Sequence, residues 1–221
     1  MTRAEIIAYA TAQLGITDSA AVTQAGTILD RWWAVIWNAF PWRQTRNSQA
    51  LAVSANTQDY ALSSDFDAVK VCRWAGRNEV LPTTDEAELA TDPAGYDAGG
   101  SVERFVILPR SSNVMQLRLV RIPQESGTLL VIGKKKLVVL AGGDTPPIPG
   151  ADMALCEFVL GDLYRWIRQH QTAEAYFAKG RELLTAMGEI EVQQSGAIHR
   201  IVPQEQVLGG GGMIDSSRPL G

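Results

Sequence analysis

The side chains best suited to chemistry in this chain are acidic residues in its middle part. Asp65 and Asp67 are separated by one residue, so in a strand both carboxylates point to the same side, as in a general acid–base pair. A hydrolase that uses Asp65, Asp67 or Glu103 is therefore one hypothesis. The simpler interpretation is a turn before a strand that starts near Val69, in which the carboxylates accept local backbone hydrogen bonds.

Two glycine-containing segments approach known motifs, and each lacks a required residue. Between Gly127 and Gly133 there are five residues where a phosphate-binding loop has four, and Lys135 occupies the position of the magnesium-binding Ser or Thr. The segment 99–103 differs from a nucleophile elbow because a glutamate replaces the second glycine. The two histidines, His170 and His199, have no second ligand at metal-binding spacing. We expect no catalytic residue, no metal and no cofactor.

Four tryptophans gather near the end of a predicted helix: Trp32, Trp33, Trp37 and Trp42. Trp33 and Trp37 are four residues apart and share a helix face. The favoured interpretation is packing between a helical part and a β-part, and a subunit interface is the alternative. Stacking of nucleic-acid bases is a third possibility, but it needs an exposed basic groove, and few cations are close in sequence.

The composition indicates a globular protein without a nucleic-acid signature. The chain has 221 residues, 46% of them hydrophobic, which is enough for one domain or two small ones. The formal net charge is -4, so a basic footprint is absent at the level of the whole chain. Cys72 and Cys156 are too far apart to suggest a metal site or a disulfide framework. We expect no signal peptide and no membrane span, hence a soluble protein.

The hydrophobic pattern predicts helices at both ends and strands between them. Thr2 and Glu5 fit a capping box that starts a helix over 2–14, and Asp18 or Ser19 caps a second helix to about Phe40. The buried stripe predicted for this second helix is Val22, Ala25, Leu29, Trp33, Ile36 and Phe40. Strands are predicted at 49–54, 68–75, 102–108, 114–121 and 128–139.

The remaining predicted segments are two helices, two connections and a tail. A short helix is expected at 84–90, an exposed loop at 91–101 and a stiff linker at 142–149. Helices follow at 151–169, with Leu155, Val159, Leu163 and either Trp166 or Ile167 on one face, and from Thr172 onward.

Segregated helices and strands predict an α+β fold: a helical bundle formed by the N- and C-terminal helices, with an inserted antiparallel β-module and an extended C-terminal tail. The expected boundaries are 1–46 for the N-terminal helices, 47–143 for the β-rich module, 144–192 for the C-terminal helices and 193–221 for the tail.

The tail combines glycine, proline and serine with widely spaced apolar residues. A disordered terminus is one interpretation. A docking tail that uses backbone pairing and small apolar pockets on a partner is the one we favour. Its candidate anchors are Ile201, Val202, Val207, Leu208, Met213 and Ile214.

Several local patterns occur in a characteristic order. The helix end at 36–42 (Ile-Trp-Asn-Ala-Phe-Pro-Trp) precedes the segment 59–66 (Asp-Tyr-Ala-Leu-Ser-Ser-Asp-Phe). The segment 144–149 (Asp-Thr-Pro-Pro-Ile-Pro) then leads into a helix that contains Leu163 and Tyr164. Over roughly residues 18–190 this series resembles the head-to-tail adaptor, or connector, proteins of tailed phages.

The resemblance implies a structural virion protein without enzymatic activity. Members of that family form rings of about twelve copies below the portal, and their C-terminal segment reaches into the portal protein. The implied partners are other copies of the chain, the portal and a downstream tail or neck protein, with double-stranded DNA passing without specific binding. The implied location is the virion neck, after assembly in the bacterial cytoplasm. The alternative is a carbohydrate- or cell-surface-binding module, with Trp74, Tyr96 and Phe105 as an exposed platform.

Overall fold

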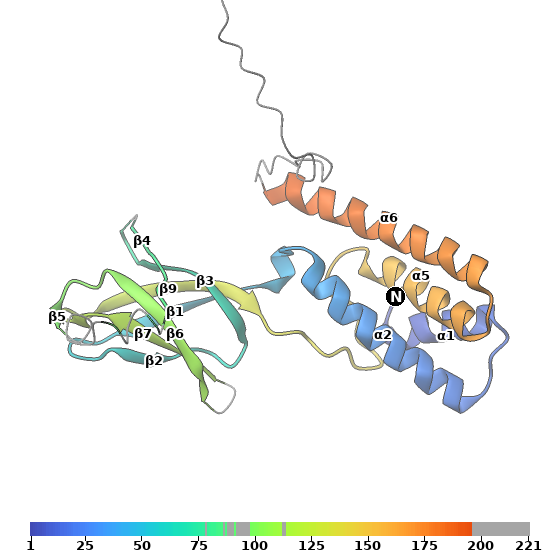
Figure 1. Ribbon diagram of the computed structural model, residues 1–221, viewed down its shortest axis with the longest axis horizontal. Helices are drawn as coiled ribbons and strands as arrows, with labels where there is room; N and C mark the ends of the chain where they lie inside the picture. Colours follow the sequence, from blue (N-terminus) through green and yellow to red (C-terminus); the bar gives the residue numbers. More distant parts are fainter. Residues whose placement is uncertain (78, 86, 88–90, 92–97, 112–113, 196–221) are drawn as a thin grey trace, which may run out of the picture.

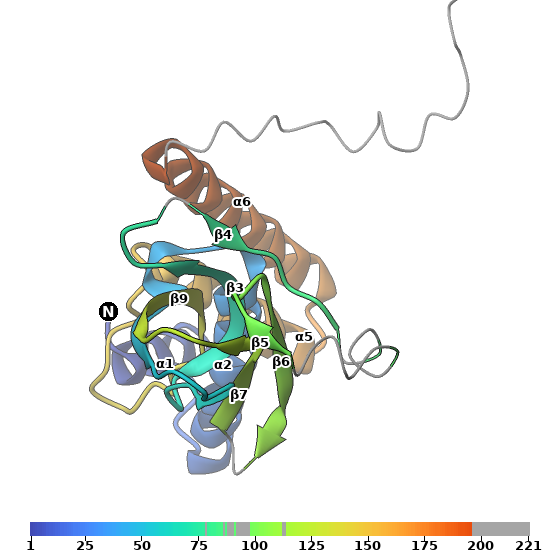
Figure 2. The same ribbon diagram turned by 90° about the vertical axis from the view of Figure 1, so that its left-hand side faces the viewer.

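The protein has a helical lobe and a β-lobe arranged along one long axis (Figure 1). The computed structural model describes residues 1–77, 79–85, 87, 91, 98–111 and 114–195. Viewed from the end of the β-lobe, the strands lie in front of the helices (Figure 2). Helices together with antiparallel sheets confirm the predicted mixed α+β class.

The two N-terminal helices begin at the caps that the sequence predicted. Helix α1 spans Arg3–Gln13, and Thr2 and Glu5 form both hydrogen bonds of the capping box. Helix α2 spans Ser19–Ala39, with Asp18 accepting a hydrogen bond from the amide of Ala21. Arg3 of α1 forms an ion pair of 2.9 Å with Asp30 of α2, which ties the two helices together.

The predicted stripe of α2 is correct in its middle and wrong at its start. Ala25, Leu29, Trp33 and Ile36 are buried, whereas the Val22 side chain is 39% exposed. Ala21, four residues before Ala25, continues the buried face in its place.

The C-terminal helices α5, Ala151–Trp166, and α6, His170–Ser195, pack along each other. Arg168 adopts a left-handed φ of 65° in the turn between them. The predicted buried face of α5 ends at Leu163, because Trp166 and Ile167 sit at this turn and are 57% and 42% exposed.

Phenylalanine rings pack against glycines, which lets α5 and α6 lie close together. Phe177 of α6 lies over Gly161 of α5, and Phe158 of α5 lies over Gly180 of α6. An added Cβ would come within 2.7 Å and 2.8 Å of these rings, so only glycine fits without a shift.

The linker between the lobes packs against the helices instead of standing free. Leu140 and Ile148 are buried in the helical core. The carbonyls of Gly142 and Asp144 accept hydrogen bonds from the first-turn amides of α1, at 2.9 Å from Ala4 and 2.8 Å from Arg3. The linker therefore satisfies donors that a helix N-terminus leaves open.

The β-lobe is built from two main antiparallel sheets. One has the strand order β1-β9-β3-β4 and the other β2-β7-β6. Their bounds are β1 Arg46–Val53, β2 Asp59–Ala61, β3 Phe66–Trp74, β4 Val80–Leu81, β6 Arg104–Ser111, β7 Val114–Val120 and β9 Gly127–Lys135. Leu129 and Val131 from the first sheet and Leu117 and Leu119 from the second share one fully buried core.

Two segments differ from the sequence prediction because pairing partners decide where strands lie. The predicted strand 128–139 ends at Lys135, where the pairing of β9 with β3 ends at Phe66. Within the predicted loop 91–101, Gly99–Gly100 forms β5, which pairs in parallel with β8, Ile122–Pro123. Most of the helix predicted at 84–90 lies outside the described residues. Among the residues that are described, no helix meets the length and hydrophobicity needed to cross a membrane.

Candidate functional site

Trp33 and Trp37 connect the C-terminal half of α2 to the end of β9 and the segment that follows it. Both side chains are almost completely buried, and their rings meet edge to face with centroids 5.4 Å apart. The indole N–H of Trp33 donates to the carbonyl of Val138 at 2.7 Å, and that of Trp37 donates to Lys135 at 3.4 Å. The polar atom of each ring is therefore used within the chain, at the junction of the two lobes.

The other two tryptophans of the group pack against helices. Trp42 is 1% exposed and donates to the carbonyl of Ile36 at 2.7 Å. Trp32 is half-buried, stacks on Phe158 with centroids 4.2 Å apart and donates to Asp162 at 2.6 Å. Of the four rings, only Trp32 keeps more than a few per cent of its surface open, which leaves little for base stacking or for contact with another subunit.

The interface between α5 and α6 contains a buried carboxylate that the sequence analysis missed. The Glu157 side chain is only 8% exposed, and Lys179 of α6 donates to its Oε1 at 2.5 Å. This hydrogen bond raises the pKa of Lys179. Next to it, Tyr164 and Tyr176 stack at 5.1 Å, and burial, followed by the proximity of Tyr164, raises the pKa of Tyr176.

The three acidic residues considered for hydrolysis have local roles. Asp65 lies in a turn, where its amide contacts the Ser63 hydroxyl and its carbonyl accepts from the amide of Lys136. Asp67 is exposed on β3. Glu103 precedes β6 and forms an exposed ion pair with Arg121 at 3.1 Å.

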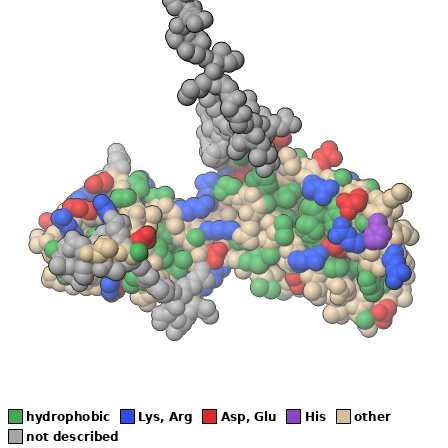
Figure 3. Space-filling model, viewed as in Figure 1, with side chains coloured by type: hydrophobic (Ala, Val, Ile, Leu, Met, Phe, Trp, Pro, Cys, Tyr) green, Lys and Arg blue, Asp and Glu red, His purple; other side chains and the backbone are tan. Residues whose placement is uncertain are grey.

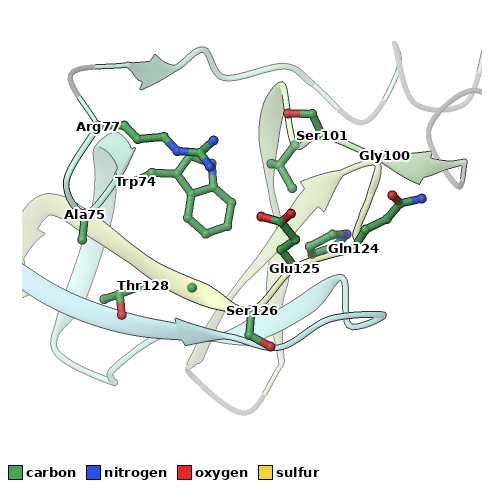
Figure 4. A pocket seen from close by; sticks show the side chains of 12 residues that line it. Trp74, Ala75, Arg77, Gly100, Ser101, Gln124, Glu125, Ser126 and Thr128 are labelled. Atoms are coloured by element: carbon green, nitrogen blue, oxygen red, sulfur yellow. The ribbon is translucent and has the colours of Figure 1, made fainter.

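The end of the β-lobe far from the helices holds an open pocket of about 530 Å³ (Figure 4). Trp74 and Arg77 line one side, and Ser101, Gln124 and Glu125 line another. The pocket therefore has one aromatic ring and a polar rim.

The aromatic platform proposed for carbohydrate does not form as predicted. Phe105 is 2% exposed and belongs to the β-core, and Tyr96 lies outside the described residues. Of the two predicted platform residues that the structure describes, Trp74 lines the pocket and Phe105 does not.

The motif-like segments lie on strands or at a helix start. Gly127–Lys135 is strand β9, and Gly99–Gly100 is strand β5. His170 is the first residue of α6, and His199 lies outside the described residues. Within the described part of the chain, no group of His, Cys, Asp and Glu side chains has the geometry to hold a metal ion.

The predicted docking anchors belong to the part of the chain that follows α6. All six, Ile201, Val202, Val207, Leu208, Met213 and Ile214, lie outside the described residues.

Comparison with known proteins gives one family match. A search of curated proteins found no match to the chain. The model of the SU10 adaptor protein family matches residues 1–203, which include both lobes and the start of the tail. This match confirms the predicted resemblance to phage head–tail adaptors. The chain thus belongs to the SU10 adaptor protein family.

Proposed function

We propose that the protein is a ring-forming adaptor that joins the phage portal to the tail or neck and forms part of the DNA channel. The family match over residues 1–203 carries this proposal. Each copy in the ring contacts two neighbours through a heterologous interface that closes after about twelve copies. The segment that follows α6, residues 196–221, enters the portal and is held there by its apolar side chains.

The organisation of the chain is compatible with a separate docking tail. The buried apolar residues of the described chain run from Ile6 to Phe177, so the two cores are built from residues that precede the tail. Helix α6 carries the chain to Ser195, at the end of that helix near the junction of the lobes (Figure 1). A tail that leaves from this point can contact a partner while both lobes keep their folds.

The adaptor role is favoured over carbohydrate binding by the burial of Phe105. A glycan platform needs several aromatic faces open to solvent, and among the described residues that line the pocket Trp74 is the one aromatic ring. The adaptor role is also favoured over hydrolysis, because the carboxylate of Glu103 forms an ion pair with Arg121 on the surface.

Deletion of residues 196–221 tests the docking tail. We expect the shortened protein to keep its circular dichroism spectrum and its melting temperature within a few degrees, and to lose attachment to portal-bearing heads in a sedimentation assay. If the shortened protein unfolds, the tail is part of the core and the docking proposal is wrong.

Point substitutions separate the apolar anchors from the rest of the tail. Replacing the six candidate anchors, Ile201, Val202, Val207, Leu208, Met213 and Ile214, by serine should abolish attachment to heads. Replacing Gln204, Glu205 and Gln206 by serine is the matched control, and this variant should attach like the unaltered protein. Equal attachment of both variants would show that the apolar side chains are not the anchors.

A further inference from the structure

A basic groove lies at the waist, where the two lobes meet. It has a volume of about 570 Å³ and is lined by residues from the end of α2 and from β1, β3 and β9. Arg46, Lys70 and Lys134 line it, and its lining includes no Asp or Glu. Figure 3 shows basic side chains gathered at the narrow part of the molecule between the lobes.

The three cations come from three adjacent strands. Arg46 of β1 lies directly opposite Lys134 of β9, and Lys70 lies in a bulge of β3 beside the same stretch of β9. Like charges opposite each other destabilise a sheet, and a bulge can redirect a side chain. The three strands therefore concentrate positive charge in one groove of a protein whose net charge is -4.

Within the described part of the chain, no carboxylate neutralises the groove cations. Arg46 and Lys70 are exposed, and neither has an ion-pair partner among the described residues. Lys134 donates a hydrogen bond to the side-chain oxygen of Asn38, which is neutral. The neighbouring Arg43, by contrast, lies outside the groove lining and is paired with Glu191 at 3.5 Å.

The apolar part of the groove determines which anion fits. Phe40, Pro41, Val71 and Ile132 also line it. The phosphate backbone of a duplex contacts a row of cations and gains nothing from an apolar surface in a pocket. An acidic peptide with a large apolar side chain matches both features, because its carboxylates reach the cations while the apolar group is buried.

We propose that the waist groove is a docking site for an acidic, leucine- or phenylalanine-containing segment of another structural protein of the virion. The assignment of the partner to the virion rests on the proposed adaptor function. The chemistry of the groove rests on the residues that line it. The site would give the adaptor a second contact, separate from its tail.

Peptide binding to the full chain tests the groove without portal or heads. The probe is a fluorescein-labelled peptide of about twelve residues in which glutamates flank two leucines in a Gly-Ser background. One control peptide carries lysine in place of glutamate, and another carries serine in place of leucine. Fluorescence anisotropy should show that the acidic leucine peptide binds at least about tenfold more tightly than either control, and that added salt weakens it.

Variants of the chain place this binding at the waist. The double variant Arg46→Gln and Lys70→Gln should bind the acidic leucine peptide at least about tenfold more weakly. Its melting temperature should be unchanged or higher, because Arg46 no longer repels Lys134. Arg77→Gln, an exposed cation in the distant pocket of the β-lobe, is the matched control and should bind normally.

Three results would overturn the proposal. The first is equal binding of the acidic and basic peptides, or no binding of either. The second is unchanged binding by the double variant. The third is displacement of the peptide by a short DNA duplex that binds more tightly. The last result would assign the groove to nucleic acid. Failure of tail-dependent attachment to heads would contradict the adaptor function. It would not change the conclusion that the peptide experiment gives about the groove.

Discussion

At the scale of single residues, the contact between Glu157 and Lys179 shows how the final packing gives a role to a side chain. Lys179 is 60% exposed at its side chain, whereas Glu157 is buried under α6. The amine is therefore held at the surface by a carboxylate that has lost most of its water. The second carboxylate oxygen of Glu157 is buried without a hydrogen-bond partner, so it depends on this one cation.

Lys179→Met should destabilise the protein by about 1–2 kcal/mol, because it leaves the Glu157 carboxylate without its counter-charge. Urea unfolding at neutral pH measures this, with the exposed Arg181→Met as a control that should change stability by less than about 0.5 kcal/mol. The pKa of Lys179 is raised in the folded state, so its contribution is complete at neutral pH and is lost as the pH rises through and above 10.5. Equal effects of both variants would show that the pair does not stabilise the fold.

The two cysteines should be unreactive in the folded protein. Burial raises the pKa of Cys72 to about 12 and that of Cys156 to about 11, so both thiols are protonated near pH 8. A thiol-specific colour reagent should label neither until denaturant unfolds the chain, since the thiolate is the nucleophile. Rapid labelling under native conditions would mean that one of the cores opens easily.

Sequence patterns identified the role of a residue where that role depends on neighbouring residues, and missed it where the role depends on distant parts of the chain. Thr2 and Glu5 were placed correctly because a capping box needs only neighbouring residues. The clustering of the tryptophans was visible in the sequence as well, although Val138, which accepts a hydrogen bond from Trp33, lies about a hundred residues further along the chain. Glu157 gave no signal, because its burial depends on how α6 lies across α5.

At the scale of elements, the glycine–phenylalanine contacts set the distance between α5 and α6. Glycine weakens an isolated helix, so its presence at Gly161 and Gly180 has a cost that close packing offsets. A third contact of this kind places Phe40, at the end of α2, against Gly188. Together these contacts hold α6 along the helical lobe, up to the waist.

Gly180→Ala should lower stability by about 1–3 kcal/mol, because the new methyl group would lie 2.8 Å from the buried Phe158 ring. Gly26→Ala in α2 is the matched control: its Cβ would meet the flexible end of Arg3 at 3.1 Å and Cδ1 of Ile7 at 3.6 Å, an ordinary van der Waals distance. That variant should be neutral or more stable by up to about 1 kcal/mol through helix propensity. Thermal unfolding compares the two, and a stabilised Gly180→Ala would refute close packing at this point.

The limits of strands were less predictable than those of helices because pairing is non-local. The alternation of buried and exposed side chains continues past the end of β9, since Val138 and Leu140 pack in the helical core while Val139 is 81% exposed. Strand β9 still ends at Lys135, where β3 no longer accompanies it. Similarly, β5 exists because Gly99 and Gly100 meet β8, which a sequence window cannot show.

At the scale of the whole molecule, the family and the distribution of charge point to an assembly component. The net charge of -4 disfavours binding to DNA, and the basic side chains that line the waist groove share it with apolar residues. A mildly acidic ring around a duplex would repel it slightly and favour sliding. Trp166 and Met153 are exposed, so the helical lobe carries apolar side chains at its surface.

The state of assembly is expected to depend on the partner. Purified alone, the protein should be a monomer of 24.0 kDa in light scattering. On portal-bearing heads it should appear as a ring of about twelve copies in images of the neck, because the portal aligns the copies so that their heterologous contacts close. The variant without residues 196–221 should remain monomeric in both settings, since it lacks the segment that recruits it. A preformed ring in solution would show that subunit contacts alone drive closure, and a monomer that ignores the portal would contradict the adaptor function.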